Sequence, residues 1–386
     1  MRLQFLSSLL FALLLPAQER GELFAAVHET LAASFHDARF RKEQLPALAA
    51  RYRDLARATA SLAEERAVIH AFLAEIPASH LALYSRSTYE HLLDDLQGKK
   101  APTLGLELGE RGGRYFVHDV LEGGPAAAAG VLRGDRVLAV DGVPTGGSAR
   151  LDARSDDAAL PDRPQHLLLA ADGERVRLAI ERRPGEAQEF EVVAARYSAL
   201  LATRASIRVL ERSGRSIGYL RLRFMHMTGV PQLVQDALAK ALAGCEAVVL
   251  DLRGRGGNAA AVTALARVLA QHQDRFRFVF LVDQQARSAK EALAHEIRRQ
   301  GLGPLVGERT AGALLPATFQ DVGQDSVLMF PSFTLGALSR EIEGKGVEVD
   351  IEAPAPGPYS AGADPILAAG LAAALSAAQP RRALLR

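Results

Sequence analysis

The sequence predicts a multidomain α/β protein in which a helical N-terminal region and a β-rich module precede an α/β core. The 386 residues are enough for two or three domains of ordinary size. Residues 22–96 are rich in Ala, Leu, Arg and Glu at helical spacing. Beyond Lys100, hydrophobic and polar residues alternate as they do in strands. From Ser216 onward, strand and helix patterns follow each other, which indicates a mostly parallel sheet covered by helices.

The helical region, assigned to residues 20–98, contains one clear interruption. Apolar residues recur at helical spacing over 45–56 and again over 69–76. Pro77 ends the second run, so that His80 is expected in a short segment outside the helices. A helix resumes before Gly98, a residue that is typical of a helix end.

The β-rich module is assigned to residues 101–197. Its strands are expected at 104–108, 115–120, 137–140, 166–169, 176–180 and 190–193. A polar stretch over 148–164 is predicted to be a loop.

The α/β core is assigned to residues 205–378. Strands are expected at 217–223, 246–252, 276–282 and 305–307, and helices at 231–243, 259–272 and 288–300. Hairpins are predicted over 327–348, and a final Ala/Leu helix after Pro365.

The first 17 residues predict an export signal. Arg2 precedes an apolar run from Leu3 to Leu15, and Ala17 is a small residue at the expected cleavage point. The protein is therefore expected in the periplasm of a bacterium or outside the cell, without a stable membrane span after cleavage. An uncleaved anchor or a buried helix remains the alternative.

Composition excludes several classes of function. With 46 basic and 45 acidic residues the net charge is +1, which gives no support for nucleic-acid binding. The single cysteine, Cys245, excludes an intramolecular disulfide and is interpreted as a small buried residue. No metal-ligand spacing occurs, so neither a metal nor another cofactor is expected.

Ser288 is the first candidate for chemistry, because it follows a buried strand and begins a helix. Unpaired N–H groups and the helix dipole would stabilise negative charge there. Ser288 and Glu291 also fit a capping box, which would merely start the helix.

A glycine-dense loop from Arg253 to Gly257 follows the strand that ends near Asp251. Sites of open α/β sheets form at this carboxyl edge, and glycine allows close backbone approach to a ligand. A tight turn between strand and helix is the alternative.

Together these motifs resemble the C-terminal-processing (tail-specific) serine protease family. The similarity lies in four motifs in the family's order: Asp251–Gly257, Ala286–Glu291, Val306–Gly312 and Gly346–Ile351. Upstream, the stretches Leu104–Leu108 and Gly124–Gly142 are similar to the family's PDZ domain. The resemblance implies a core of crotonase-like ββα sheet-and-helix layers beside a PDZ-like domain.

One position departs from the pattern of many members, which place a catalytic Lys where this chain has Ala313. The branch that includes the tricorn core protease is more similar, since it uses Ser with a His and a Glu. That resemblance implies Ser288 as nucleophile, His80 as general base and Glu343 as the supporting carboxylate. His226 competes with His80, and Glu341 and Glu348 lie near Glu343.

The resemblance also implies backbone oxyanion donors and a peptide-binding strand. The donors would be the N–H groups of Gly256 or Gly257 and of Ala289. The strand Leu104, Gly105, Leu106, Glu107 and Leu108 would bind a polypeptide tail by strand addition, unless the module is only a spacer. The expected function is a serine endopeptidase acting on such tails, with a catalytically inactive peptide-binding scaffold as the alternative.

Overall fold

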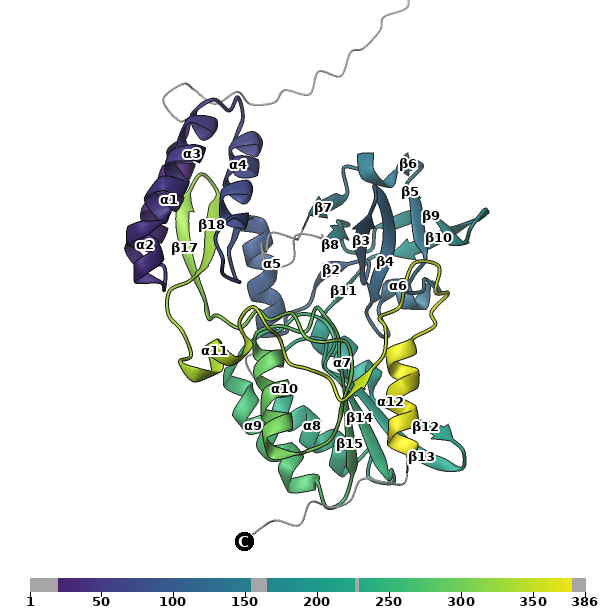
Figure 1. The fold of residues 1–386 in the computed structure, drawn as a ribbon. Helices are drawn as coiled ribbons and strands as arrows, with labels where there is room; N and C mark the ends of the chain where they lie inside the picture. Colours follow the sequence, from purple (N-terminus) through teal and green to yellow (C-terminus); the bar gives the residue numbers. More distant parts are fainter. Residues whose placement is uncertain (1–19, 154–164, 226–228, 377–386) are drawn as a thin grey trace, which may run out of the picture.

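The computed structural model describes residues 20–153, 165–225 and 229–376, and three groups of elements build it (Figure 1). The export signal predicted over 1–17 and the competing His226 lie outside these ranges. Within the described ranges, no helix combines the length and the apolarity that crossing a membrane requires.

The helical region packs four helices around a core of its own. They are α1 (Glu22–Ser34), α2 (Ala38–Glu43), α3 (Leu45–Arg57) and α4 (Leu62–Ala74). Phe24 and Phe72 meet edge to face at the centre of this core, with ring centroids 5.1 Å apart. The chain then continues through β1 (Ala82–Ser85) into α5 (Arg86–Gln97), which leads to the β-rich module.

A hairpin from the C-terminal half of the chain completes this N-terminal core. It consists of β17 (Ala317–Gly323) and β18 (Ser326–Pro331), and β18 pairs antiparallel with β1. Leu328 and Phe330 of the hairpin are buried among the residues of α1 and α4. Because β1 pairs with β18, the segment just before β1, which contains His80, lies against the chain that follows β18 and leads to Glu343.

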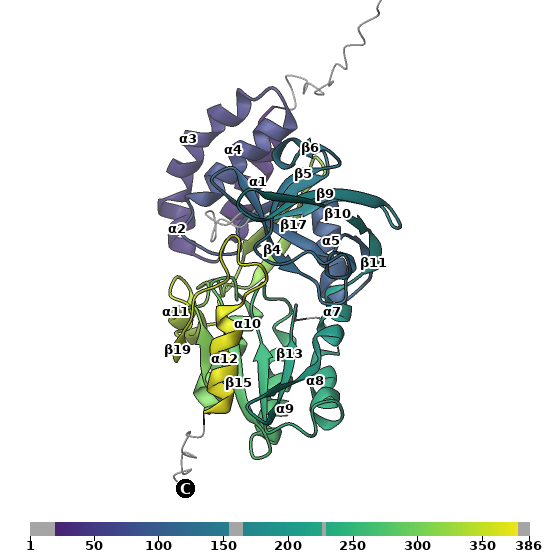
Figure 2. The same ribbon diagram turned by 90° about the vertical axis from the view of Figure 1, so that its right-hand side faces the viewer.

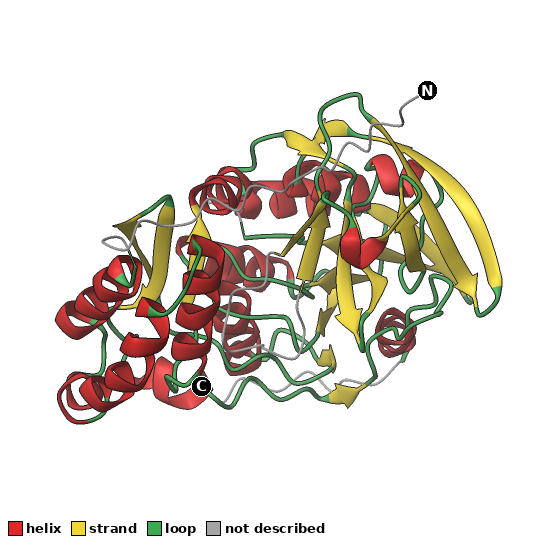
Figure 3. Ribbon diagram, turned by 90° about the horizontal axis from the view of Figure 1, so that it is seen from above, coloured by secondary structure: helices red, strands yellow, loops and turns green. Residues whose placement is uncertain are grey.

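The β-rich module is built around one large sheet, whose long strands lie to one side of the helical region (Figure 3). The strand order is β10-β9-β5-β4-β3-β8-β7, with β6 paired to β5, and a separate pair joins β11 to β2. The elements are β2 (Ala101–Thr103), β3 (Leu106–Arg111), β4 (Arg114–Val120), α6 (Pro125–Ala128), β5 (Arg136–Val140), β6 (Val143–Pro144), η1 (Thr145–Gly147), β7 (Leu151–Ala153), β8 (Gln165–Leu168), β9 (Arg175–Arg183), β10 (Glu186–Val193) and β11 (Ala195–Tyr197).

The core is a six-stranded sheet in the order β12-β13-β14-β15-β16-β19, parallel from β13 onward. Helices α8, α9 and α10 cover one face and α12 covers the other (Figure 2). Its elements are α7 (Ala199–Ser206), β12 (Arg208–Arg212), β13 (Arg215–Arg221), α8 (Val230–Ala239), β14 (Ala247–Asp251), α9 (Ala260–His272), β15 (Arg277–Val282), α10 (Ala289–Gln300), β16 (Leu305–Gly307), α11 (Ala337–Ile342), β19 (Ile351–Glu352) and α12 (Pro365–Leu375).

Both faces of this sheet are apolar because helices cover both. The five residues of β14 are all buried, and so are the last five of β15. The carboxyl ends of β13, β14 and β15 meet at one edge, which brings the glycine loop and Ser288 together.

Two local predictions need correction. The hairpins expected over 327–348 are wrong, because β18 ends at Pro331 and the short helix α11 follows. The loop expected over 148–164 contains β7, which pairs with β8, and its remainder from residue 154 lies outside the described residues.

Candidate active site

Ser288 stands between β15 and α10 in a backbone conformation that side chains rarely adopt. Its φ is 54° and its ψ is −123°, whereas a helix cap takes extended angles. The side chain makes no capping hydrogen bond, so the capping-box interpretation is wrong. Strain of this kind costs about 1–3 kcal/mol and is concentrated at functional sites. It leaves the half-buried hydroxyl at the N-terminus of α10.

Glu291 binds the segment after β16 instead of capping the helix. Its Oε1 accepts from the Thr310 hydroxyl at 2.6 Å and the Gly312 N–H at 2.7 Å, and its Oε2 from the Ala313 N–H at 2.7 Å. Burial raises the pKa of Glu291 despite these bonds. The Ala313 carbonyl in turn accepts the Ser288 N–H at 2.8 Å. Ala313 therefore positions the serine through its backbone, while its methyl group supplies no base.

The glycine loop lies directly against Ser288. A Cβ placed on Gly256 would meet the Ser288 Cβ at 2.8 Å and the Arg287 carbonyl oxygen at 2.4 Å, so only glycine fits there. Gly257 has a φ of 125°, and a Cβ placed on it would meet the Met225 carbonyl oxygen at 2.4 Å. Within the described ranges, the N–H groups of Gly256, Gly257 and Ala289 form no hydrogen bond. These three groups remain available as oxyanion donors.

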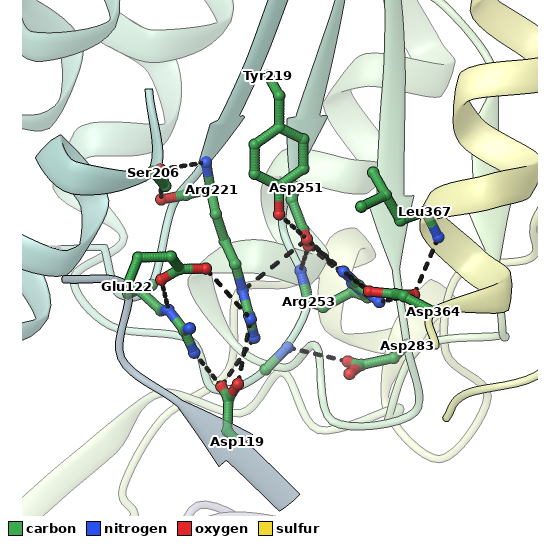
Figure 4. Close-up of polar contacts among 12 residues, drawn as sticks. Asp119, Glu122, Ser206, Tyr219, Arg221, Asp251, Arg253, Asp283, Asp364 and Leu367 are labelled. Atoms are coloured by element: carbon green, nitrogen blue, oxygen red, sulfur yellow. Dashed lines mark hydrogen bonds and ion pairs between the residues drawn. The ribbon is translucent and has the colours of Figure 1, made fainter. Parts of the chain in front are cut away.

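One carboxylate joins the glycine loop to the turn before Ser288. The Oδ1 of Asp283 accepts from the N–H groups of Gly254 at 2.9 Å, Gln285 at 3.1 Å and Ala286 at 2.9 Å. Figure 4 shows this carboxylate beside the start of the loop. The loop and the turn thus share one anchor, which fixes their relative position.

His80 is connected to Glu343 through the hydroxyl of Ser79. The Ser79 Oγ lies 3.1 Å from Glu343 Oε2, to which it donates, and 2.9 Å from His80 Nδ1. A hydroxyl carries one proton, so Nδ1 is the donor in the bond with Ser79. In a neutral imidazole whose proton is on Nδ1, the Nε2 atom carries the lone pair that can accept a proton.

Glu343 also connects this pair to the nucleophile segment. Its Oε2 accepts the N–H groups of Leu314 at 2.7 Å and Leu315 at 3.1 Å, directly after the residue that holds Ser288. Its Oε1 accepts the Ser79 N–H at 2.8 Å. A continuous path of backbone and side-chain contacts thus links Ser288 to His80, although more than 200 residues separate them in sequence.

The neighbouring carboxylates point elsewhere. Glu341 binds His295 at 2.9 Å near the surface. Glu348 forms an exposed ion pair with Arg309. Glu343 is therefore the carboxylate of this group that reaches His80. The sequence motifs assigned no role to Ser79, which connects His80 to Glu343. Its position directly before His80 could have indicated that role.

A buried ionic cluster joins the β-rich module to the core near the same edge (Figure 4). Asp119 at the end of β4 pairs with Arg133 of its own module and with Arg221 and Arg223 of the core. Burial alone would raise the pKa of Asp119, but the three guanidinium groups hold it well below its usual range. His118 adds a hydrogen bond of 2.9 Å to Gln285, in the turn before Ser288. The module is thus fixed to the nucleophile turn.

The predicted peptide-binding strand has a partner within the chain along part of its edge. β8 pairs antiparallel with β3 at Leu108 and Gly109. Further along, a cavity of about 230 Å³ is lined by Leu106 and Glu107 together with residues 167–170. The Leu121 N–H donates to the Gly105 carbonyl. Successive residues of an antiparallel strand direct their N–H and C=O groups to opposite sides, so those of Leu106 are directed away from β4. The Leu106 backbone is therefore directed toward this cavity.

Comparisons with known proteins show which families this chain resembles. Residues 268–353, which include Ser288 and Glu343 but not His80, match Peptidase family S41. Residues 116–154 match the PDZ domain. The chain resembles the C-terminal-processing peptidases of family S41. That resemblance, predicted from the sequence motifs, is confirmed.

A curated relative supports the same resemblance, and two solved structures share the fold. The carboxyl-terminal-processing protease of a Picosynechococcus species is 25% identical over 224 residues, or 52% of this chain and 51% of that protein. The alignment thus spans about half the length of that relative. The photosystem II D1 C-terminal processing protease has a TM-score of 0.52 at 20% identity, over 86% of this chain and 92% of that one. The tricorn protease has a TM-score of 0.53 at 16% identity, over 92% and 36%. These similarities confirm the predicted fold class.

Proposed function

We propose that this chain is a serine endopeptidase in which Ser288 is the nucleophile, His80 the general base and Glu343 the carboxylate that acts through Ser79. The observation that carries the proposal is the path of hydrogen bonds from Glu343, which reaches His80 on one side and the segment holding Ser288 on the other. The strained backbone of Ser288 adds to it, and so do the N–H groups of Gly256 and Gly257, which form no hydrogen bond within the described residues.

The proposed reaction proceeds by acyl-enzyme chemistry. The Ser288 Oγ attacks the peptide carbonyl carbon while its proton passes to His80 Nε2, and the carbonyl oxygen becomes an oxyanion bound by backbone N–H groups. The C–N bond then breaks as His80 returns the proton to the leaving amine. Water, activated by His80, hydrolyses the ester and restores the serine.

The substrate we propose is a polypeptide tail, bound first by the β-rich module. An extended peptide would add to the start of β3 at Leu106 and Glu107, where the Leu106 backbone is directed toward the cavity. β8 already uses the edge at Leu108, so fewer backbone bonds are available than on an open strand. From the signal predicted over residues 1–17 we infer that the chain would meet such substrates in the periplasm or outside the cell.

Proteolysis of an unfolded protein at neutral pH tests the proposal. Wild type should cleave it, and Ser288→Ala and His80→Ala should each lower kcat by about 10³-fold or more. Ser87→Ala, at an exposed position of α5, serves as the control and should match wild type. A serine-reactive fluorophosphonate should label wild type at Ser288.

Two other outcomes oppose the proposal. Cleavage by Ser288→Ala at the wild-type rate would assign the activity to another residue. No cleavage and no adduct, together with binding of a tail peptide, would favour the peptide-binding scaffold that the loss of Lys at position 313 suggests.

A further inference from the structure

Lys290 is a buried, ionisable residue that the proposed reaction does not use. It is the second residue of α10, two positions after Ser288, and its side chain is 0% exposed. Its Nζ donates to the carbonyl oxygens of Arg253 at 2.8 Å and Arg223 at 3.3 Å. Both acceptors are backbone groups, and neither belongs to α10.

The two carbonyls belong to the two segments that shape the proposed oxyanion site. Arg253 begins the glycine loop, which continues to Gly256 against Ser288. Arg223 leads to Met225, whose N–H donates to the Gly256 carbonyl at 3.0 Å and whose carbonyl accepts the Asn258 N–H at 2.7 Å. One amine therefore links both segments to the first turn of the nucleophile helix.

This position is unfavourable for a lysine on grounds of stability alone. Burial lowers the pKa of Lys290 to about 7. No carboxylate forms an ion pair with it anywhere in the part of the chain that the structure describes. A cation in the first turn of a helix also opposes the helix dipole. An apolar side chain of similar length would fill the space without these costs.

The charged groups around Lys290 come from each strand end that packs against it. Arg221 at the end of β13 and Arg223 beyond it favour the neutral amine, whereas Asp283 after β15 and Asp251 of β14 favour the charged form. Even as a neutral amine Lys290 keeps two N–H donors, which match its two carbonyl acceptors. The tie to both segments therefore persists on either side of neutral pH.

We propose that Lys290 is a positioning residue that holds the glycine loop against the nucleophile helix, so that the N–H groups of Gly256 and Gly257 face the oxyanion beside Ser288. The inference rests on the proposed function for its effect on catalysis. Its structural part, the hold on the 253–257 loop, does not depend on that function.

The test compares wild type with Lys290→Met, which keeps the length and removes both donors. Lys240→Met, on the exposed surface after α8, is the matched control. Lys290→Met should lower kcat about 100-fold with KM nearly unchanged, because a displacement of about 1 Å at a catalytic group has an effect of that size. Lys290→Gln keeps donors on a shorter side chain and should recover part of that loss.

Amide hydrogen exchange separates this inference from the proposed function. Exchange of the hydrogen-bonded amides of Arg223, Met225 and Gly254 should accelerate at least tenfold in Lys290→Met, while exchange in α9 stays unchanged. Faster exchange in an enzyme that is inactive even as wild type would keep the positioning role and reject the proposed function. Unchanged exchange, or a kcat within twofold of wild type in a folded Lys290→Met, would overturn the inference.

Discussion

The catalytic core and the β-rich module differ in how completely their proposed machinery is formed. In the core, hydrogen bonds join Ser79 and His80, Glu343 and Leu314, and Gly256 leaves no space for a side chain beside Ser288. In the module, the strand proposed to bind a peptide already pairs with β8 over part of its edge. The proposed chemistry therefore uses a preformed site, whereas a bound peptide would share the edge of β3 with β8.

The strongest test of a preformed core is Gly256→Ala. Its Cβ would displace the Ser288 or Arg287 backbone, so that at least one oxyanion donor moves out of place. We expect kcat to fall about 10²–10³-fold, roughly 3–4 kcal/mol of transition-state stabilisation. Cleavage and fluorophosphonate labelling measure it, and Gly244→Ala, at an exposed position with open space around it, is the control. Wild-type activity in Gly256→Ala would mean that the site is not preformed.

The junction between the two regions should be sensitive to Asp119→Asn. The variant leaves the largely buried Arg221 and Arg223 without their main partner, and removing one member of a buried pair costs about 3 kcal/mol. Thermal unfolding measures this loss, with Glu189→Gln on the exposed face of the module as control.

The pH dependence of this junction has a definite sign. The folded-state pKa of Asp119 is depressed, so its stabilisation is fully present above the unfolded pKa of about 4 and is lost as pH falls toward the folded value. The difference in Tm between wild type and Asp119→Asn should therefore shrink below about pH 4. A constant difference would mean that the ionic cluster contributes little.

Glu343 and Glu341 should differ in their effect on kcat. Glu343→Gln keeps the size of the side chain but removes the charge that supports Ser79 and His80. A hydrogen bond to a charged group contributes about 2 kcal/mol, so kcat should fall about 30-fold. Glu341→Gln, whose side chain binds only His295 near the surface, should leave kcat unchanged. Equal effects of both variants would contradict the assignment.

The stability of the core should depend on the protonation of Lys290. Its folded pKa of about 7 lies below the unfolded value of about 10.4, so the unfolded chain binds more protons between these limits. Wild-type stability should rise with pH across this window relative to Lys290→Met. Calorimetric scans at pH 6 and pH 10 measure the change, and a pH-independent difference would show that the amine is not perturbed.

The smallest expected effect concerns the shared edge of the module. Arg150 donates to the Leu169 carbonyl and pairs with Asp141 and Glu174, which steadies the chain after β8. Arg150→Ala should raise the affinity for a tail peptide about fivefold, because partly exposed ion pairs contribute about 1 kcal/mol. Peptide anisotropy on a Ser288→Ala background measures it, with Arg175→Ala as control. Unchanged affinity would mean that β8 does not compete.

Much of the layout followed from local sequence patterns, because each element carries its own period and its own end signals. The strand 305–307 agrees with β16, and the helix expected over 259–272 begins one residue later as α9. The four ordered motifs were enough to indicate the family resemblance and to nominate Ser288, whereas His80 and Glu343 were nominated by the resemblance to the branch that includes the tricorn core protease. The capping-box alternative failed because a local spacing does not reveal that Glu291 binds Thr310 and Ala313 across the core.

The sequence by itself determined which residue types stand at the strand ends: a serine before a helix, a glycine loop after a buried strand and a Ser-His pair after a proline break. Only the tertiary structure decided that β1 pairs with β18, that Ser79 lies between His80 and Glu343, and that β8 takes part of the β3 edge. The physical reason is range. Periodicity and capping act over a few residues, whereas these contacts join segments far apart in the chain and depend on which surfaces are buried together.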